Sequence, residues 1–106
     1  METVIVNAVN NYKLRKMPEG AKWQNAVCYD PAQYAMCGFR DAHIRVGDYV
    51  VVSGLGAIGQ IAIQLAKRAG ASIVIGVDPI KKRREIALKH GADYCLDSTQ
   101  CDVGFE

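Results

Sequence analysis

The sequence predicts an α/β fold built on a parallel β-sheet. Two β-branched runs, 49–53 and 72–78, and a shorter run, 92–97, are each bounded by turn-forming residues. Two amphipathic segments of helical length, 57–69 and 79–91, separate these predicted strands. Strands that alternate with helices of this length are joined by crossover connections, which make neighbouring strands parallel.

The residues before this pattern predict less regular elements. Residues 3–9 (TVIVNAV) are strand-like, 10–20 form a polar connection, and 23–27 (WQNAV) form a short helical turn. A longer helix is expected from Asp30, which can cap it, with Pro31 at the first helical position. The apolar stripe of this helix consists of Ala35, Met36, Phe39 and Ala42.

The central strand and helix carry the clearest pattern. After a tight turn at 45–48 (RVGD), the run 49–53 (YVVVS) is continuously apolar until its last residue, as expected for a strand buried on both faces. The following helix, 57–69, is ended by Gly70. Its predicted buried face consists of Ile58, Ile61, Ala62, Leu65 and Ala66.

Composition restricts the class of protein. The chain has 106 residues, half of them hydrophobic, and a net charge of +2, which predicts one ordinary globular domain and no general binding of nucleic acid. No apolar run approaches the roughly 20 residues of a membrane span, and no signal peptide is visible. The absence of a C-x-x-C pair argues against a structural zinc knuckle, and because no export signal is visible, reduced thiols in a cytoplasmic protein are expected. The cysteines are Cys28, Cys37, Cys95 and Cys101.

Three glycines connect the first predicted strand of the sheet to its helix. Gly54, Gly56 and Gly59 form the pattern G-x-G-x-x-G. In a dinucleotide-binding turn, the first glycine permits a sharp turn, the second lets the backbone approach a pyrophosphate, and the third lets the helix pack on the strand. The N–H groups at the start of such a helix then face the phosphates.

An acidic residue follows at the distance that this interpretation requires. Asp78 ends the second strand, nineteen positions after Gly59, where a carboxylate can bind both ribose hydroxyls. The alternatives are a plain strand–helix turn in which Asp78 caps the next helix, or a site for S-adenosylmethionine.

Asp78 favours NAD(H), because it would repel the 2′-phosphate of NADP(H). The basic run 81–84 (KKRR) would favour NADP(H), unless it is only a solvated helix face.

A complete dinucleotide-binding (Rossmann) domain contains two β-α-β-α-β halves, and this sequence predicts only the first, with strand order 3-2-1. Residues 30–106 form this half-domain, and residues 1–29 form the N-terminal strand and connecting segment. The chain is therefore expected to be a piece of a longer protein. The strand 49–53 would then form an exposed apolar edge, which predicts a homo-oligomer or a strand-swapped dimer.

Three stretches of the chain resemble the zinc-dependent medium-chain alcohol dehydrogenases, especially their sorbitol and threonine dehydrogenase branch. They are MPEGAKWQNAV, DPAQYAMCGFRDAHIRVGDYVVVSGLGAIGQIAIQLAKRAGA and VIGVDPIKKRREIALKHGADYCLD. The resemblance implies NAD-dependent hydride transfer between an alcohol and a carbonyl, with a catalytic zinc that polarises the substrate oxygen. It places Ile58 beside the cofactor, Asp78 at the adenosine ribose and Arg83 beside the adenosine. The expected cofactor-binding residues are Gly54, Leu55, Gly56, Ala57, Ile58, Gly59, Asp78 and Arg83.

The resemblance also assigns Asp30 to a position where the sorbitol branch carries an acidic residue at the zinc. The other zinc-binding residues of the family have no counterpart here, so the chain by itself is expected neither to hold zinc nor to catalyse the reaction, and no catalytic residue is assigned. His43 and His90 are expected to be structural or surface residues. The leading hypothesis is the NAD(H)-binding portion of an alcohol or polyol dehydrogenase. The alternative is a non-catalytic nucleotide-binding or interaction module that pairs through its exposed sheet edge.

Overall fold

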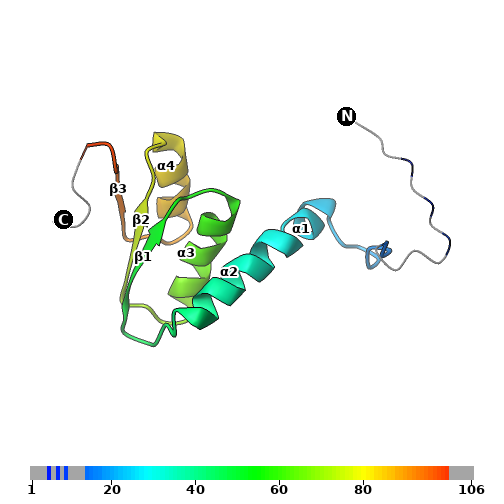
Figure 1. Ribbon diagram of the computed structural model, residues 1–106, viewed down its shortest axis with the longest axis horizontal. Coiled ribbons are helices and arrows are strands. Elements are labelled where there is room, and N and C mark those ends of the chain that lie inside the picture. Colours follow the sequence, from blue (N-terminus) through cyan, green and yellow to red (C-terminus); the bar gives the residue numbers. More distant parts are fainter. Residues whose placement is uncertain (1–4, 6, 8, 10–13, 101–106) are drawn as a thin grey trace.

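The computed structural model describes residues 5, 7, 9 and 14–100. The predicted strand 3–9 falls largely outside the described residues, and so does Cys101. Helices and strands alternate along most of the described chain (Figure 1). They are α1 (Trp23–Val27), α2 (Tyr29–Asp41), β1 (Tyr49–Ser53), α3 (Ala57–Arg68), β2 (Ile73–Val77), α4 (Lys81–Lys89) and β3 (Tyr94–Leu96).

The three strands form one parallel sheet in the order β1-β2-β3, which confirms the predicted order 3-2-1. The register pairs Ser53, the last residue of β1, with Val77, the last residue of β2. The residues that follow these two strands therefore emerge side by side at the carboxyl edge of the sheet. This register brings the residues after β1 next to Asp78. Leu55 and Asp78 are hydrogen-bonded, although 23 positions separate them in the sequence.

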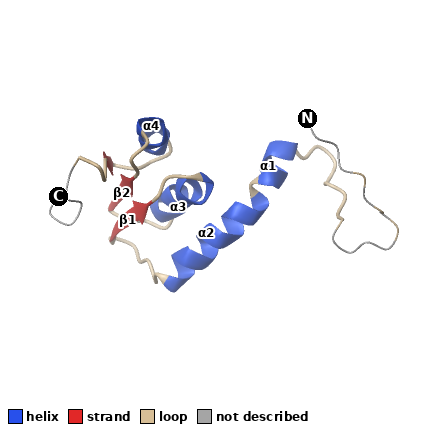
Figure 2. Ribbon diagram, turned by 45° about the horizontal axis from the view of Figure 1, so that its top comes forward, coloured by secondary structure: helices blue, strands red, loops and turns tan. Residues whose placement is uncertain are grey.

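Helices α3 and α4 lie on the same face of the sheet (Figure 2) and enclose the hydrophobic core with it. In α3 the buried residues are Gly59, Ile63 and Ala66, and Ile63 is completely buried. The predicted buried face was therefore wrong in its centre, because it omitted Ile63 and included the half-exposed Ile58. The reason is that α3 contacts α2 and α4 as well as the sheet, and the predicted face, with Ile58 and Ala62, lines the groove beside α2 instead of the core. The core consists of Leu55, Ile63, Ala66, Ala71, Val74, Ala87 and Ala92.

The start of α2 differs from the prediction. The helix begins at Tyr29, so Asp30 lies in its first turn rather than at the cap. The cap residue is Cys28, whose backbone is helical (φ −80°, ψ −6°), and α1 and α2 therefore follow one another with a single residue between them. Within the predicted stripe of α2, Ala35 is buried and Phe39 is half-buried, whereas Met36 and Ala42 are exposed.

Strand β1 forms the edge of the described sheet, as predicted. Its burial alternates: Val50 and Val52 pack against the core, whereas Tyr49 and Val51 are exposed. Burial on both faces was therefore not observed. A groove of about 530 Å³ runs along this edge, between β1, α2 and α3. Among the described residues, no helix has the length and apolarity needed to cross a membrane.

Candidate functional site

The glycine turn has the geometry that its sequence pattern predicts. Gly54 has a φ of +84°, a left-handed conformation that favours glycine. Its N–H donates to the carbonyl of Val77 (2.8 Å), which fixes the turn to the neighbouring strand. A Cβ atom on Gly59 would overlap the carbonyl oxygen of Gly54. Gly59 therefore permits α3 to start directly against the turn.

Gly56 has a different role, because it is the cap residue of α3 and has open space around it. A Cβ atom there would meet no other group within 4 Å. Ala57 and Ile58, at the first helical positions, are exposed. The first N–H groups of a helix have no partner within the helix, and together with the helix dipole they favour an anion. The turn thus presents an accessible helix N-terminus.

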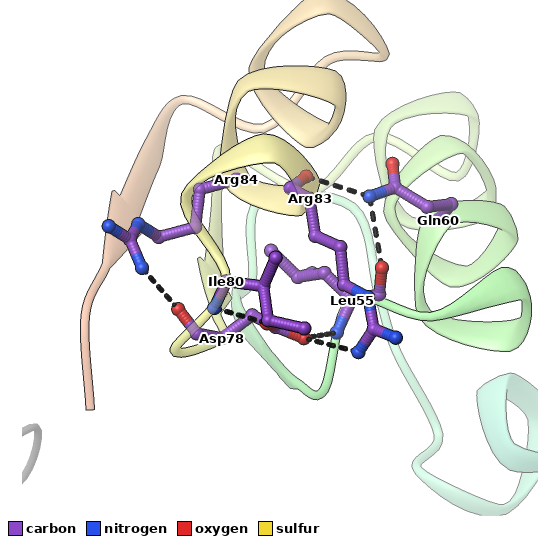
Figure 3. A network of polar contacts seen from close by, with 6 residues as sticks. All are labelled: Leu55, Gln60, Asp78, Ile80, Arg83 and Arg84. Carbon is purple, nitrogen blue, oxygen red and sulfur yellow. Dashed lines mark hydrogen bonds and ion pairs between the residues drawn. The ribbon is translucent and has the colours of Figure 1, made fainter. Parts of the chain in front are cut away.

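Asp78 lies directly beside this turn, at the carboxyl end of β2, and is only 2 % exposed. One carboxylate oxygen accepts a hydrogen bond from the Leu55 N–H (2.8 Å), and the other accepts one from the Ile80 N–H (2.7 Å). The Arg83 guanidinium contacts the carboxylate at 3.4 Å (Figure 3). Asp78 therefore joins the glycine turn to the segment that leads into α4.

These contacts keep Asp78 ionised. The Ile80 N–H has the largest effect and lowers the pKa of the carboxyl, and the Leu55 N–H and Arg83 lower it further. Burial acts in the opposite direction, but the pKa still lies below its ordinary value. The site at the carboxyl edge thus contains a buried negative charge at neutral pH.

We expect acid to destabilise the fold only below about pH 4. The pKa of Asp78 is lowered as described, that of Asp93 is lowered mainly by Lys67, and that of Asp97 mainly by the Thr99 hydroxyl. A carboxyl group whose pKa is lowered by folding stabilises the fold fully above its unfolded-state pKa, here 3.8. The fold loses this stabilisation as the pH falls through the lower, folded-state pKa. Urea unfolding between pH 7 and pH 2.5 measures this. A free energy of unfolding that stays constant down to pH 3 would contradict it.

The basic run 81–84 does not act as one patch. Arg84 donates to the backbone carbonyl of Asp78 (2.7 Å) and forms an ion pair with Asp97 (2.9 Å), so its charge is engaged within the fold. Lys81 lies 4.0 Å from Glu85 on the exposed face of α4. Among the described cations of this run, Arg83 is the one that contacts the Asp78 carboxylate, and its side chain is 48 % exposed.

The sequence analysis missed Gln60. Its side chain contacts the carbonyl oxygens of Leu55 and Arg83, so it takes part in the network around Asp78 (Figure 3). The available signal was a polar residue directly after the third glycine, at a position that faces other elements of the fold rather than solvent.

The described residues do not fit a zinc site by themselves. Asp30 is exposed on α2, and no group of three or more possible metal ligands occurs among the described residues. His43 follows α2 and its ring contacts the carbonyl of Asp41, whereas His90 caps α4. Burial raises the pKa of the Cys95 thiol, which makes it a poor nucleophile. No disulfide joins Cys28, Cys37 and Cys95, the cysteines within the described residues.

Comparison with known proteins agrees with this architecture. Residues 57–104 match the model of the family described as zinc-binding dehydrogenase. The D-guloside 3-dehydrogenase of Escherichia coli K12 is 75 % identical over 105 residues, which include 99 % of this chain. The chain belongs to the zinc-binding dehydrogenase family. It spans 30 % of the length of that curated relative.

Among the solved structures that this chain resembles, one holds NADH and another holds NADP. A short chain alcohol dehydrogenase from Escherichia coli CFT073, in complex with NADH, superimposes with a TM-score of 0.76 at 32 % identity, over 86 % of this chain and 27 % of that one. A zinc-binding dehydrogenase from Sinorhizobium meliloti 1021, bound to NADP, superimposes with a TM-score of 0.67 at 33 % identity, over 69 % of this chain and 21 % of that one. Similarity to these structures therefore does not decide between the two cofactors.

Proposed function

We propose that the glycine turn and Asp78 hold the adenosine diphosphate portion of a nicotinamide dinucleotide, with NAD(H) preferred over NADP(H). The observation that carries this proposal is the buried, ionised carboxylate of Asp78 directly beside an accessible helix N-terminus. The turn binds the pyrophosphate, Asp78 binds the ribose, and Arg83 lies beside the adenosine. The residues in contact with the cofactor are Gly54, Leu55, Gly56, Ala57, Ile58, Gly59, Asp78 and Arg83.

The contacts of Asp78 indicate how the ribose reaches it. A carboxylate has about four lone-pair positions, and the N–H groups of Leu55 and Ile80 occupy two of them at short distance. The longest contact is that of Arg83 (3.4 Å), whose side chain is 48 % exposed. We propose that Arg83 swings aside when the ribose hydroxyls bind, and then contacts the adenosine.

The preference for NAD(H) follows from charge. A ribose 2′-phosphate would lie against the Asp78 carboxylate, which repels it. Arg84 is already paired with Asp97 and with the Asp78 backbone, so it is not available to balance that phosphate. Arg83 is the nearest remaining cation, and it is attracted to Asp78 itself.

For the longer protein we propose hydride transfer between an alcohol or polyol and the nicotinamide. The 75 % identity to a D-guloside 3-dehydrogenase favours a sugar-derived polyol as substrate. Zinc would supply polarisation of the substrate oxygen in that protein, and Asp30 would lie at or near it. In this proposal residues 30–106 contribute the first half of the dinucleotide-binding domain, residues 1–29 contribute the connecting segment, and the chemistry takes place on residues outside this chain.

Calorimetric titration of the purified chain with NADH, NADPH and S-adenosylmethionine tests the cofactor class. We expect weak binding that is strongest for NADH. Tighter binding of S-adenosylmethionine would replace the proposal with a different nucleotide class, and tighter binding of NADPH would reverse the assigned preference. Failure of all three ligands to bind would overturn nucleotide binding as the function of this chain.

A second candidate function is an interaction module, and the free edge of β1 favours it. Tyr49 is 74 % exposed and Val51 is 58 % exposed at this edge. An uncovered apolar strand pairs readily with another strand, so a second copy of the chain is the expected partner. Light scattering at micromolar concentration tests for a homo-oligomer or strand-swapped dimer, and a monodisperse monomer would contradict this candidate.

A further inference from the structure

Gln60 connects two segments that are distant in the sequence. It lies in the first turn of α3 and is half-buried. Its amide nitrogen donates to the carbonyl of Leu55 in the glycine turn (3.2 Å) and to the carbonyl of Arg83 in the first turn of α4 (2.9 Å; Figure 3).

The orientation of this amide is fixed by its partners. Both carbonyl oxygens can only accept hydrogen bonds, so the Gln60 side chain must present its NH₂ group to them. Its oxygen then faces Nδ1 of His90 at 3.3 Å, which acts as the donor in the tautomer that carries a proton on Nδ1. The side chain therefore has partners on both ends of its amide group.

The two residues that Gln60 holds are the same two that contact one oxygen of the Asp78 carboxylate. The N–H of Leu55 donates to the Asp78 carboxylate, and the guanidinium of Arg83 contacts it. From this geometry we infer that Gln60 is a positioning residue of the cofactor site, which sets the distance between the glycine turn and Arg83. This inference rests on the proposed nucleotide binding.

The variant Gln60→Met tests it, because methionine has nearly the same length but no amide donors. We expect NADH to bind about three- to tenfold more weakly, since up to two neutral hydrogen bonds of the site are lost. Gln64→Met is the matched control. Gln64 lies one turn further along α3, and its amide donates to the Gln60 carbonyl within the same helix (3.1 Å). We expect its effect on NADH binding to stay within about twofold.

A double-mutant cycle with Arg83→Ala separates positioning from general destabilisation. If Gln60 acts through Arg83, the Gln60→Met change should weaken binding much less when Arg83 is already absent. Fully additive losses would overturn the inference, and so would unchanged NADH binding in Gln60→Met while the wild-type chain binds.

Should Gln60→Met not fold, as judged by circular dichroism, Gln60→Glu is measured instead. Failure of both variants to fold would assign Gln60 to stability alone, which also overturns the inference. A wild-type chain that binds no nucleotide would remove the proposed function together with this inference.

Discussion

Gly59→Ala is expected to destabilise the chain by about 3 kcal/mol or more and to abolish nucleotide binding. The new methyl group would overlap the carbonyl oxygen of Gly54, which is backbone and cannot rotate away. Either α3 separates from the turn or Gly54 leaves its left-handed conformation. Small domains are stable by only about 5–15 kcal/mol, so this is a large fraction of the total. Chemical denaturation and NADH calorimetry measure the two effects.

Gly56→Ala is the matched control for this prediction. A Cβ atom at Gly56 meets no other group within 4 Å, and its φ of −72° is ordinary for alanine. We expect the fold to lose less than about 1 kcal/mol. NADH binding should nevertheless weaken, because the methyl group lies where the pyrophosphate approaches the backbone. If both variants were equally stable, the assigned role of Gly59 would be wrong.

Asp78→Ala is expected to weaken NADH binding about tenfold or more, and NADPH binding by less, so that the preference for NADH disappears. The variant loses the ribose acceptor and the charge that repels a 2′-phosphate. It also leaves the N–H groups of Leu55 and Ile80 without their acceptor and frees Arg83. A lower midpoint of thermal unfolding should accompany the loss of selectivity.

Asp93→Ala separates selectivity from stability. Asp93 is also a carboxylate with a lowered pKa; it accepts hydrogen bonds from the Val74 N–H (2.7 Å) and from Lys67 (2.8 and 2.9 Å). It precedes β3 and contacts the amino-terminal part of β2, whereas the glycine turn follows the carboxyl end of β1. We expect this variant to be less stable but to keep the ratio of NADH to NADPH affinity. An equal loss of selectivity in both variants would show that Asp78 has no specific role at the ribose.

The parts of the fold that depend on local pattern were predictable. The β-branched runs with helices between them gave the three strands and their order, and the left-handed turn at Gly54 followed from the glycine spacing. Proximity of Asp78 to the turn was also predictable, because parallel neighbouring strands end at the same edge of a sheet.

Features that depend on tertiary contacts were not predictable. Ile63 is central to the core because the face of α3 that carries it packs with the sheet and α4, whereas Ile58 and Ala62 of the predicted face line the groove beside α2. Arg84 and Arg83 are adjacent and alike in the sequence, and their tertiary contacts distinguish their roles: Arg84 contacts Asp97 and the Asp78 backbone, whereas Arg83 contacts the Asp78 carboxylate. The contact between Gln60 and Arg83 spans 23 positions, so no local pattern indicates it.

The most direct test of the central claim is to locate the bound nucleotide on the chain. Amide chemical shifts of the ¹⁵N-labelled protein, recorded during titration with ADP-ribose, report every backbone N–H group separately. We predict that the largest changes occur at residues 54–59 of the turn, at Asp78 and at Ile80, where the N–H donates to the carboxylate. Saturable changes confined to other parts of the chain, such as α2 or the outer edge of β1, would contradict the assignment of this turn as the cofactor site.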